Sequence, residues 1–234
     1  MENNFNFEVY LLISLKKISL SVYKKKDFGL IYKNEILIDN FSNDLNFEKL
    51  DKFLNENIFK IEKELGEFIK VIYLIIENEE IFSVNLSIKN KVNKVFLNND
   101  LINNLLIEAK SCCKETLKKA TVLHMTIDQF YIDSYIYKTL PKNIRCENLC
   151  VGLSFVCIPS NFLQNFEKIF KKYQISIGKT LSYGYVNNFI EVSSNDLGSV
   201  CKKILSGINE NEVILTNKLP KNLGFFEKFF NFFN

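Results

Sequence analysis

The sequence predicts an α+β fold built on β-sheets. Short runs rich in Val, Ile, Leu and Tyr, such as residues 7–15 (FEVYLLISL), have the pattern of buried strands. Between such runs lie segments with apolar residues at helical spacing, of which residues 160–173 are the clearest. The composition agrees, because 47% hydrophobic and 24% charged residues are ordinary for a globular chain of 234 residues.

The opening of the chain has the pattern of three strands, a helix and a fourth strand. The predicted strands are residues 7–15, 18–23, 30–38 and 69–77. Asn43 or Asp44 can cap the helix that precedes the fourth strand. Its apolar face consists of Phe47, Leu50, Leu54, Ile58 and Ile61. The crossover through this helix can place the fourth strand parallel to the first.

The remainder continues the alternation of strands and helices. Helices are predicted at 99–118, with a cap near Asn99 or Asp100, at 160–173, capped by Ser160, and at 196–208. Strands are predicted at 81–88, 121–128, 130–137 and 149–159, the middle two being separate or one bent strand. Residues 209–222 are polar, contain Pro220, and are expected to form an exposed linker.

Few residues suggest catalysis or a cofactor. Glycine is scarce, with 8 in the chain, and neither GxGxxG nor a Walker lysine loop is present, which disfavours nucleotide binding. His124 is the single histidine and lies in an apolar run, so a structural role is expected. Cys146 and Cys150 lack the second pair or histidines that zinc requires, so no metal is predicted. An enzyme using His124, Asp128 and Asp133 is the minor alternative.

Charge and hydropathy constrain partners and location. The net charge is +3 and the lysines are scattered, which argues against a nucleic-acid binder. No run reaches the roughly 20 apolar residues that span a bilayer, and the N-terminus lacks a basic region before its apolar run. A cytoplasmic location is therefore expected.

Residues 223–234 end in FFEKFFNFFN and form the predicted amphipathic tail. On a helix, one face would consist of Phe225, Phe226, Phe229, Phe230 and Phe233. Half-burial of five such rings gives roughly 4–7 kcal/mol, enough for reversible binding at a membrane surface. The alternative that this face packs on the protein's own core remains open.

One segment and its surroundings resemble a known family. VLHMTIDQFYID (122–133) is similar to a segment of the bacterial cell-division protein FtsA, an actin-like protein, with Val122, Leu123, His124, Ile132 and Asp133 matching. The order of neighbouring elements resembles the inserted subdomain 1C of FtsA, and residues 9–23 resemble the first hairpin of its subdomain 1A. FtsA proteins also end in a short amphipathic membrane-targeting helix.

The resemblance implies a partial actin-like, ribonuclease H-like subdomain with an inserted 1C-like α/β subdomain. The implied organisation is a 1A-like part (1–80), a 1C-like part (81–177), a return segment (178–208), a linker (209–222) and the amphipathic helix (223–234). The sequence departs from the family at the first phosphate loop. Aligned on Lys17, Leu12 replaces the acidic residue and Ser14 replaces the glycine. No counterpart of the second actin-like half is evident.

These departures predict a protein without a cofactor and without ATPase activity. The implied function is that of an adaptor in cell division, peripheral on the inner face of the cytoplasmic membrane. The five tail phenylalanines would bind the membrane, and the 1C-like part would bind division proteins, self-association included. The alternative is an adaptor of a pilus or secretion machine of the PilM kind, which shares this plan and engages a short peptide from a membrane partner.

Overall fold

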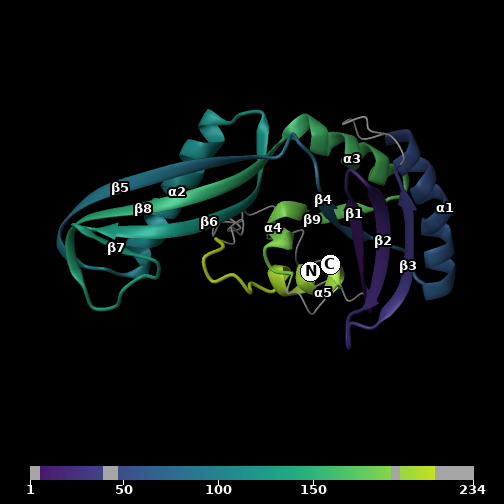
Figure 1. Ribbon diagram of the computed structural model, residues 1–234, viewed down its shortest axis with the longest axis horizontal. Coiled ribbons are helices and arrows are strands. Elements are labelled where there is room, and N and C mark those ends of the chain that lie inside the picture. Colours follow the sequence, from purple (N-terminus) through teal and green to yellow (C-terminus); the bar gives the residue numbers. More distant parts are fainter. Residues whose placement is uncertain (1–5, 39–46, 191–195, 214–234) are drawn as a thin grey trace, which may run out of the picture.

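The structure, a computed structural model, describes residues 6–38, 47–190 and 196–213. It is elongated, with one β-sheet toward each end of the long axis (Figure 1). Sheet A has five strands in the order β3-β2-β1-β4-β9, and sheet B has four in the order β5-β8-β6-β7. The predicted fold class, mixed helices and strands organised around sheets, is confirmed.

Sheet A combines an antiparallel meander with two parallel strands. Its strands are β1 (Phe7–Ile13), β2 (Lys17–Lys24), β3 (Leu30–Leu37), β4 (Val71–Ile76) and β9 (Ser176–Ser182). β4 lies parallel to β1, as the crossover predicts, and β9 lies parallel to β4. β1 occupies the centre of the sheet, which explains why its residues are apolar on both faces.

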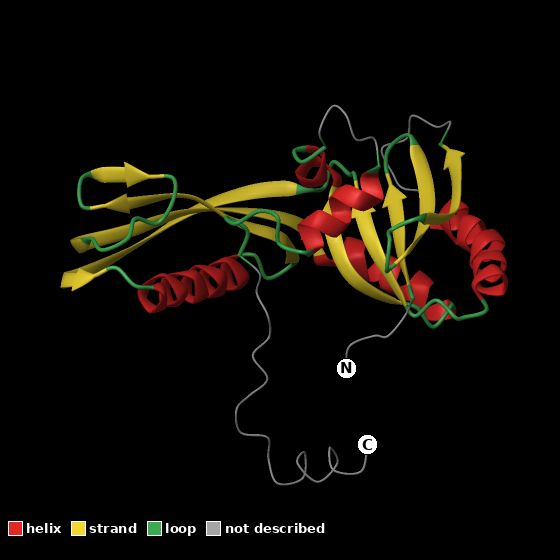
Figure 2. Cartoon of the chain, turned by 90° about the horizontal axis from the view of Figure 1, so that it is seen from below, coloured by secondary structure: helices red, strands yellow, loops and turns green. Residues whose placement is uncertain are grey.

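Helices cover both faces of sheet A (Figure 2). The helices on one face are α1 (Phe47–Leu65) and α3 (Ser160–Lys172), and those on the other are α4 (Tyr183–Asn187) and α5 (Leu197–Leu205). Val9, Leu11 and Ile13 pack toward the first pair. Tyr10 and Leu12 pack toward the second pair. The alternation of β1 therefore fills two separate cores.

Helix α3 differs from the sequence-based prediction, which assigned it to the inserted part. Its buried residues Phe162, Phe166 and Phe170 belong to the core of sheet A. The ring of Phe166 packs edge-on against Phe47 of α1, with 5.2 Å between ring centroids. Strand β8 runs directly into α3, so the chain returns to sheet A at this helix.

Sheet B is antiparallel and carries one helix. Its strands are β5 (Phe82–Phe96), β6 (Ala120–Ile132), β7 (Tyr135–Tyr137) and β8 (Arg145–Pro159), and α2 (Asn99–Thr116) packs on one face. Asn98, rather than Asn99 or Asp100, caps α2. β5 runs on well past the predicted end at residue 88, because Val92 still faces the core while the intervening polar residues face solvent.

The beginning of the predicted linker is part of the fold. The amide of Ile127 donates to the carbonyl of Asn211, and the amide of Val213 donates to the carbonyl of Met125, both at 2.8 Å. Glu212 thereby forms an antiparallel bridge with Thr126 of β6. The linker prediction is therefore wrong for residues 209–213, and residues 214–222 lie outside the described residues.

Candidate functional site

The hairpin turn between β1 and β2 stands where the resemblance places a phosphate loop. The Ser14 side chain closes this turn, since its Oγ accepts hydrogen bonds from the amides of Lys16 (3.3 Å) and Lys17 (3.1 Å). The Ser14 amide donates to the Lys17 carbonyl at 2.9 Å. The amides of Ser14, Lys16 and Lys17, which could help to cradle a phosphate, are thus already bonded within the turn.

The other two positions of this loop have apolar or paired side chains. Leu12 is buried in the core between sheet A and helices α4 and α5. Lys17 Nζ lies 3.3 Å from Glu35 Oε2, and Lys33 Nζ lies 3.8 Å from the same oxygen. Hydrogen bonding and charge from Lys17 lower the pKa of the Glu35 carboxyl. Both ammonium groups therefore have a carboxylate partner at the protein surface.

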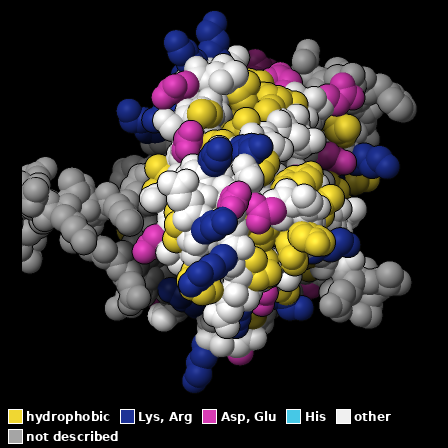
Figure 3. All heavy atoms as spheres, turned by 90° about the vertical axis from the view of Figure 1, so that its left-hand side faces the viewer, with side chains coloured by type: hydrophobic (Ala, Val, Ile, Leu, Met, Phe, Trp, Pro, Cys, Tyr) yellow, Lys and Arg dark blue, Asp and Glu magenta, His cyan; other side chains and the backbone are white. Residues whose placement is uncertain are grey.

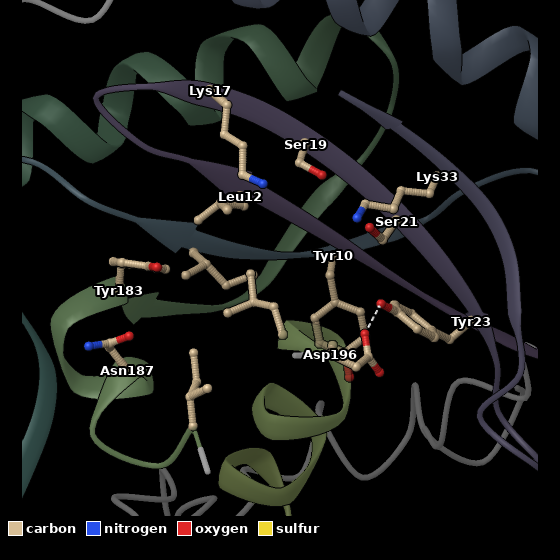
Figure 4. A pocket seen from close by; sticks show the side chains of 14 residues that line it. Tyr10, Leu12, Lys17, Ser19, Ser21, Tyr23, Lys33, Tyr183, Asn187 and Asp196 are labelled. Atoms are coloured by element: carbon tan, nitrogen blue, oxygen red, sulfur yellow. Dashed lines mark hydrogen bonds between the residues drawn. The ribbon is translucent and has the colours of Figure 1, made fainter. Parts of the chain in front are cut away.

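A cavity of about 370 Å³ lies beside this hairpin, between sheet A and helices α4 and α5. Figure 4 shows Lys17 and Lys33 along one side of it and Tyr183 and Asn187 along the other. Ser19, Ser21 and the rings of Tyr10 and Tyr23 complete much of the lining. The lining contains no His or Cys among the described residues. Its polar groups are hydroxyls, ammonium groups, one amide and the carboxylate of Asp196.

One end of the cavity is held by a tyrosine–aspartate pair. Tyr23 Oη donates to Asp196 Oδ1 at 2.6 Å (Figure 4). Asp196 also caps α5, since its Oδ2 accepts from the Ser199 amide at 3.1 Å. Burial, followed by the hydrogen bond to Asp196, raises the pKa of Tyr23. Tyr23 is therefore a neutral hydroxyl that fixes helix α5 against the sheet.

A second polar site lies where the two sheets meet. We call it the junction cluster, and it consists of His124, Lys179, Tyr185, Asn209 and Glu212. His124 on β6 is 1% exposed. Its Nε2 accepts from the Ser182 amide at 3.0 Å, so the ring proton of the neutral form lies on Nδ1 and is donated to Glu212 Oε1 at 3.0 Å.

The rest of the junction cluster encloses the Glu212 carboxylate. Tyr185 donates to Glu212 Oε2 at 2.9 Å, and Lys179 Nζ lies 3.4 Å from Oε1. The Tyr185 ring stacks on His124 with centroids 3.8 Å apart. Asn209 donates to the Tyr185 hydroxyl at 2.8 Å. This arrangement links β6, β9, α4 and the C-terminal described residues.

The electrostatics of the junction cluster favour a neutral histidine beside an ionised glutamate. Burial lowers the pKa of His124 and outweighs the opposing effect of Glu212. Burial alone would raise the pKa of Glu212, but hydrogen bonds from His124 and Tyr185, with the charge of Lys179, lower it. His124 is thus a satisfied structural histidine, as its place in an apolar run predicts.

The three residues of the minor enzyme alternative are not brought together. Both nitrogens of His124 are occupied by Ser182 and Glu212. Asp128 accepts from Ser154 on the face of sheet B away from α2. Asp133 accepts from the amides of Glu147 and Asn148 in a turn at the end of β6. Along an extended strand these positions are about 13 Å and 30 Å from His124.

Sequence reasoning missed Glu212 and Tyr185. Glu212 lies in a polar stretch with the composition of a linker, yet its side chain is only 4% exposed. The only local signal is that the next residues, Val213 and Ile214, are apolar. Within the described residues no three His, Cys, Asp or Glu side chains are grouped to hold a metal ion.

The predicted membrane-binding face lies outside the described residues. It comprises Phe225, Phe226, Phe229, Phe230 and Phe233. Among the helices that the structure describes, none has the length and apolarity to cross a bilayer.

Comparisons with known proteins find similarity in structure and not in sequence. No protein-family model matches the chain, and no curated protein sequence matches it significantly. A structure of the PilM–PilN type IV pilus biogenesis complex matches 76% of this chain and 48% of its own, at 6% identity and a TM-score of 0.46. The cytoplasmic domain of EpsL, an inner-membrane component of the Vibrio cholerae type II secretion system, matches 80% and 59%, at 12% identity and a TM-score of 0.35.

A protein of actin-like ATPase fold and unknown function from Bacteroides thetaiotaomicron matches 79% of this chain and 55% of its own. The identity is 10% and the TM-score 0.36. The chain thus spans about half the length of these three similar structures. At such identities and TM-scores the matches say nothing about activity or partners, and the fold class rests on the two sheets described above.

Proposed function

We propose that this chain is a non-catalytic adaptor of the actin-like type that acts in bacterial cell division at the inner face of the cytoplasmic membrane. The observation that carries the proposal is the β1–β2 turn, whose amides are bonded to Ser14 Oγ and whose carboxylate position is the buried Leu12. The bonded amides of this loop and the apolar side chain of Leu12 are poorly suited to a nucleotide and its metal ion.

In this proposal sheet B with helix α2 is the surface for other proteins. It has its own core and projects away from sheet A along the long axis (Figure 1). The resemblance of residues 122–133 to FtsA is the reason to place those partners in cell division. Junction residues such as Glu212 would hold this unit at a fixed angle to sheet A.

Isothermal titration calorimetry with Mg-ATP tests the absence of nucleotide binding. We expect no heat of binding for the full chain, and none for Lys17→Ala. Tight binding to the full chain that disappears in Lys17→Ala contradicts the proposal, because it would show that the hairpin still holds phosphate.

Liposome sedimentation tests attachment to the membrane through the predicted tail. We expect the full chain to sediment with vesicles of phosphatidylethanolamine and phosphatidylglycerol, and a variant ending at Asn222 to stay in the supernatant. The binding should survive high salt, because burial of five phenylalanine rings drives it and the tail has almost no net charge that salt could screen. Equal behaviour of the two proteins removes the membrane anchor from the proposal.

The second candidate is an adaptor of a pilus or secretion machine. The cavity beside the β1–β2 hairpin favours it, since about 370 Å³ lined by tyrosines and lysines has room for side chains of a bound peptide. Co-purification of the tagged full chain from its native cells separates the two. Recovery of division proteins supports the first candidate, and recovery of an inner-membrane pilus or secretion component supports the second.

A further inference from the structure

Sheet B ends on an open strand edge. β5 pairs with β8 on one side, and within the residues that the structure describes no strand pairs with its other side. It forms the outer border of the sheet in Figure 1. An edge strand presents unpaired backbone N–H and C=O groups, to which another strand can add.

The first half of the β5 edge is more regular than the other sheet edges. Its register with β8 runs without a shift from Phe82 to Lys91, over which residues 82–88 (FSVNLSI) contain no charge. Edge strands β3 and β9 both contain lysine and adjoin a register shift in their ladder. In β5 the lysines begin at Lys89 and the register shift lies between Lys91 and Val95, so both fall beyond residues 82–88. β7 is only Tyr135–Tyr137. Natural edges are commonly protected by charge, bulges or shortness, and residues 82–88 have none of these.

The exposed apolar residues at the far end of sheet B are a weaker candidate. They include Val95, Phe96, Tyr135 and Ile136. Viewed from that end, hydrophobic side chains alternate with Lys, Arg and acidic side chains over the surface (Figure 3). No large continuous apolar patch results, and nothing there indicates which partner would cover it.

Opposite charges flank the uncharged stretch of β5. Glu79 and Glu80 precede it, Lys89 and Lys91 follow it, and all four are exposed. A parallel partner of the same sequence would place like charges together. An antiparallel partner of the same sequence would place the acidic end of each strand beside the basic end of the other, which is favourable at both ends.

We propose that two copies of this chain associate through antiparallel pairing of residues 82–88, which joins two copies of sheet B into one continuous sheet. Pairing centred on Asn85 places Lys91 of one copy opposite Glu79 of the second copy, and Val84 opposite Leu86. The two-fold axis is then perpendicular to the sheet, and both α2 helices lie on the same side. Val84 and Leu86, which are partly buried against the α2 core, lose further exposure. The inference does not depend on the adaptor function.

A pair of charge-reversed variants tests the interface. One carries Lys89→Glu and Lys91→Glu, and the other carries Glu79→Lys and Glu80→Lys. The mass of the natural chain, measured by light scattering after size exclusion, should rise with concentration from 27.4 kDa toward twice that value. Each variant alone should remain monomeric, because like charges of the two copies then face each other at both ends of the paired strands. An equimolar mixture should dimerise again, which a folding defect could not produce.

A disulfide at the two-fold axis tests the register. In a Cys112→Ser background, Asn85→Cys should form a cross-linked dimer under mild oxidation, since opposed residues of an antiparallel pair lie about 4.5–5.5 Å apart at Cα. Asn90→Cys is the matched control on the same strand. It lies opposite Glu80 of the second copy rather than opposite itself, so it should not cross-link.

Three results would overturn the proposal. One is a natural chain that stays monomeric at every concentration. Another is a dimer that both charge variants form as readily as the natural chain. The third is a full chain that stays monomeric while a variant ending at Val213 dimerises. That result would assign the β5 edge to the chain's own C-terminal residues instead of to a second copy.

Discussion

At residue 198 the absence of a side chain lets helix α5 approach sheet A. A Cβ placed on Gly198 would lie 2.4 Å from Cε2 and 2.7 Å from Oη of Tyr23. The Tyr23 ring cannot easily retreat, because it stacks on Phe28 with centroids 4.4 Å apart and bonds to Asp196. This contact forms one wall of the cavity beside the hairpin, so a single glycine contributes to its shape.

We expect Gly198→Ala to lower the free energy of unfolding by about 1–3 kcal/mol, because the added methyl group overpacks a filled interface. Gly184→Ala is the matched control, since the nearest neighbour to its added Cβ is Ser182 Oγ at 3.8 Å. That substitution should be neutral or slightly stabilising. Urea unfolding of both variants measures the difference. Equal stabilities would mean that α5 packs less closely on Tyr23 than described.

At the scale of elements, the sequence predicts the helices and strands better than their partners. The spacing of Phe162, Phe166 and Phe170 predicts the buried face of α3, but spacing contains no information about which sheet that face covers. Register shifts in β6 likewise prevent the sequence pattern from predicting which side chains are buried. One lies between Val122 and His124, so strict alternation does not describe which β6 residues are buried.

The candidate site, too, could be predicted from the sequence only in part. The sequence alone shows Leu12 and Ser14 at the positions where the resemblance places an acidic residue and a glycine. The junction cluster is not visible, because His124 and Glu212 are 88 residues apart along the chain and meet only once both sheets are folded. Non-local pairs of this kind leave no periodic signal in a single sequence.

Phe166→Ala tests the assignment of α3 to the core of sheet A. Phe166 is fully buried against Phe47 and Phe162, so we expect a loss of about 3–5 kcal/mol in the free energy of unfolding. Phe59→Ala on α1 is the control, since its ring is 72% exposed and its loss should cost under about 0.5 kcal/mol. Hydrogen exchange should show the destabilisation first in β1 and β4. Faster exchange confined to β6 and β8 would contradict the assignment.

At the scale of the whole molecule, the described residues join the two sheets through chain connections, apolar contacts of Leu123 and Ile158, and the junction cluster. The chain crosses between them at the β4–β5 and β8–α3 connections, and the junction cluster adds bonds from β6 to Ser182 and Glu212. The cluster contains a buried histidine and a buried carboxylate beside one lysine. The orientation of the two sheets should therefore depend on pH.

The direction of that dependence follows from the two pKa shifts. The pKa of His124 lies below its ordinary value of 6.5, and that of Glu212 lies below its ordinary value of 4.5. In both cases the unfolded chain binds protons more readily than the folded chain. The stabilisation is therefore complete above about pH 6.5, and is lost as the pH falls, first through His124 and then through Glu212. Protonation would also put a second N–H donor on the ring, facing the Ser182 amide.

The variant His124→Gln separates the contributions of His124 and Glu212 to the pH dependence of stability. Its side-chain amide can donate to Glu212 and accept from Ser182, as the neutral imidazole does, but it does not titrate. For the natural chain we expect stability, and the exchange protection of the Ile127 and Val213 amides, to decline from about pH 6.5 downward. For the variant the decline should begin only near pH 4.5, where Glu212 still titrates. Identical pH profiles for the two proteins would show that the histidine does not govern the junction, and that carboxylates alone set its response to acid.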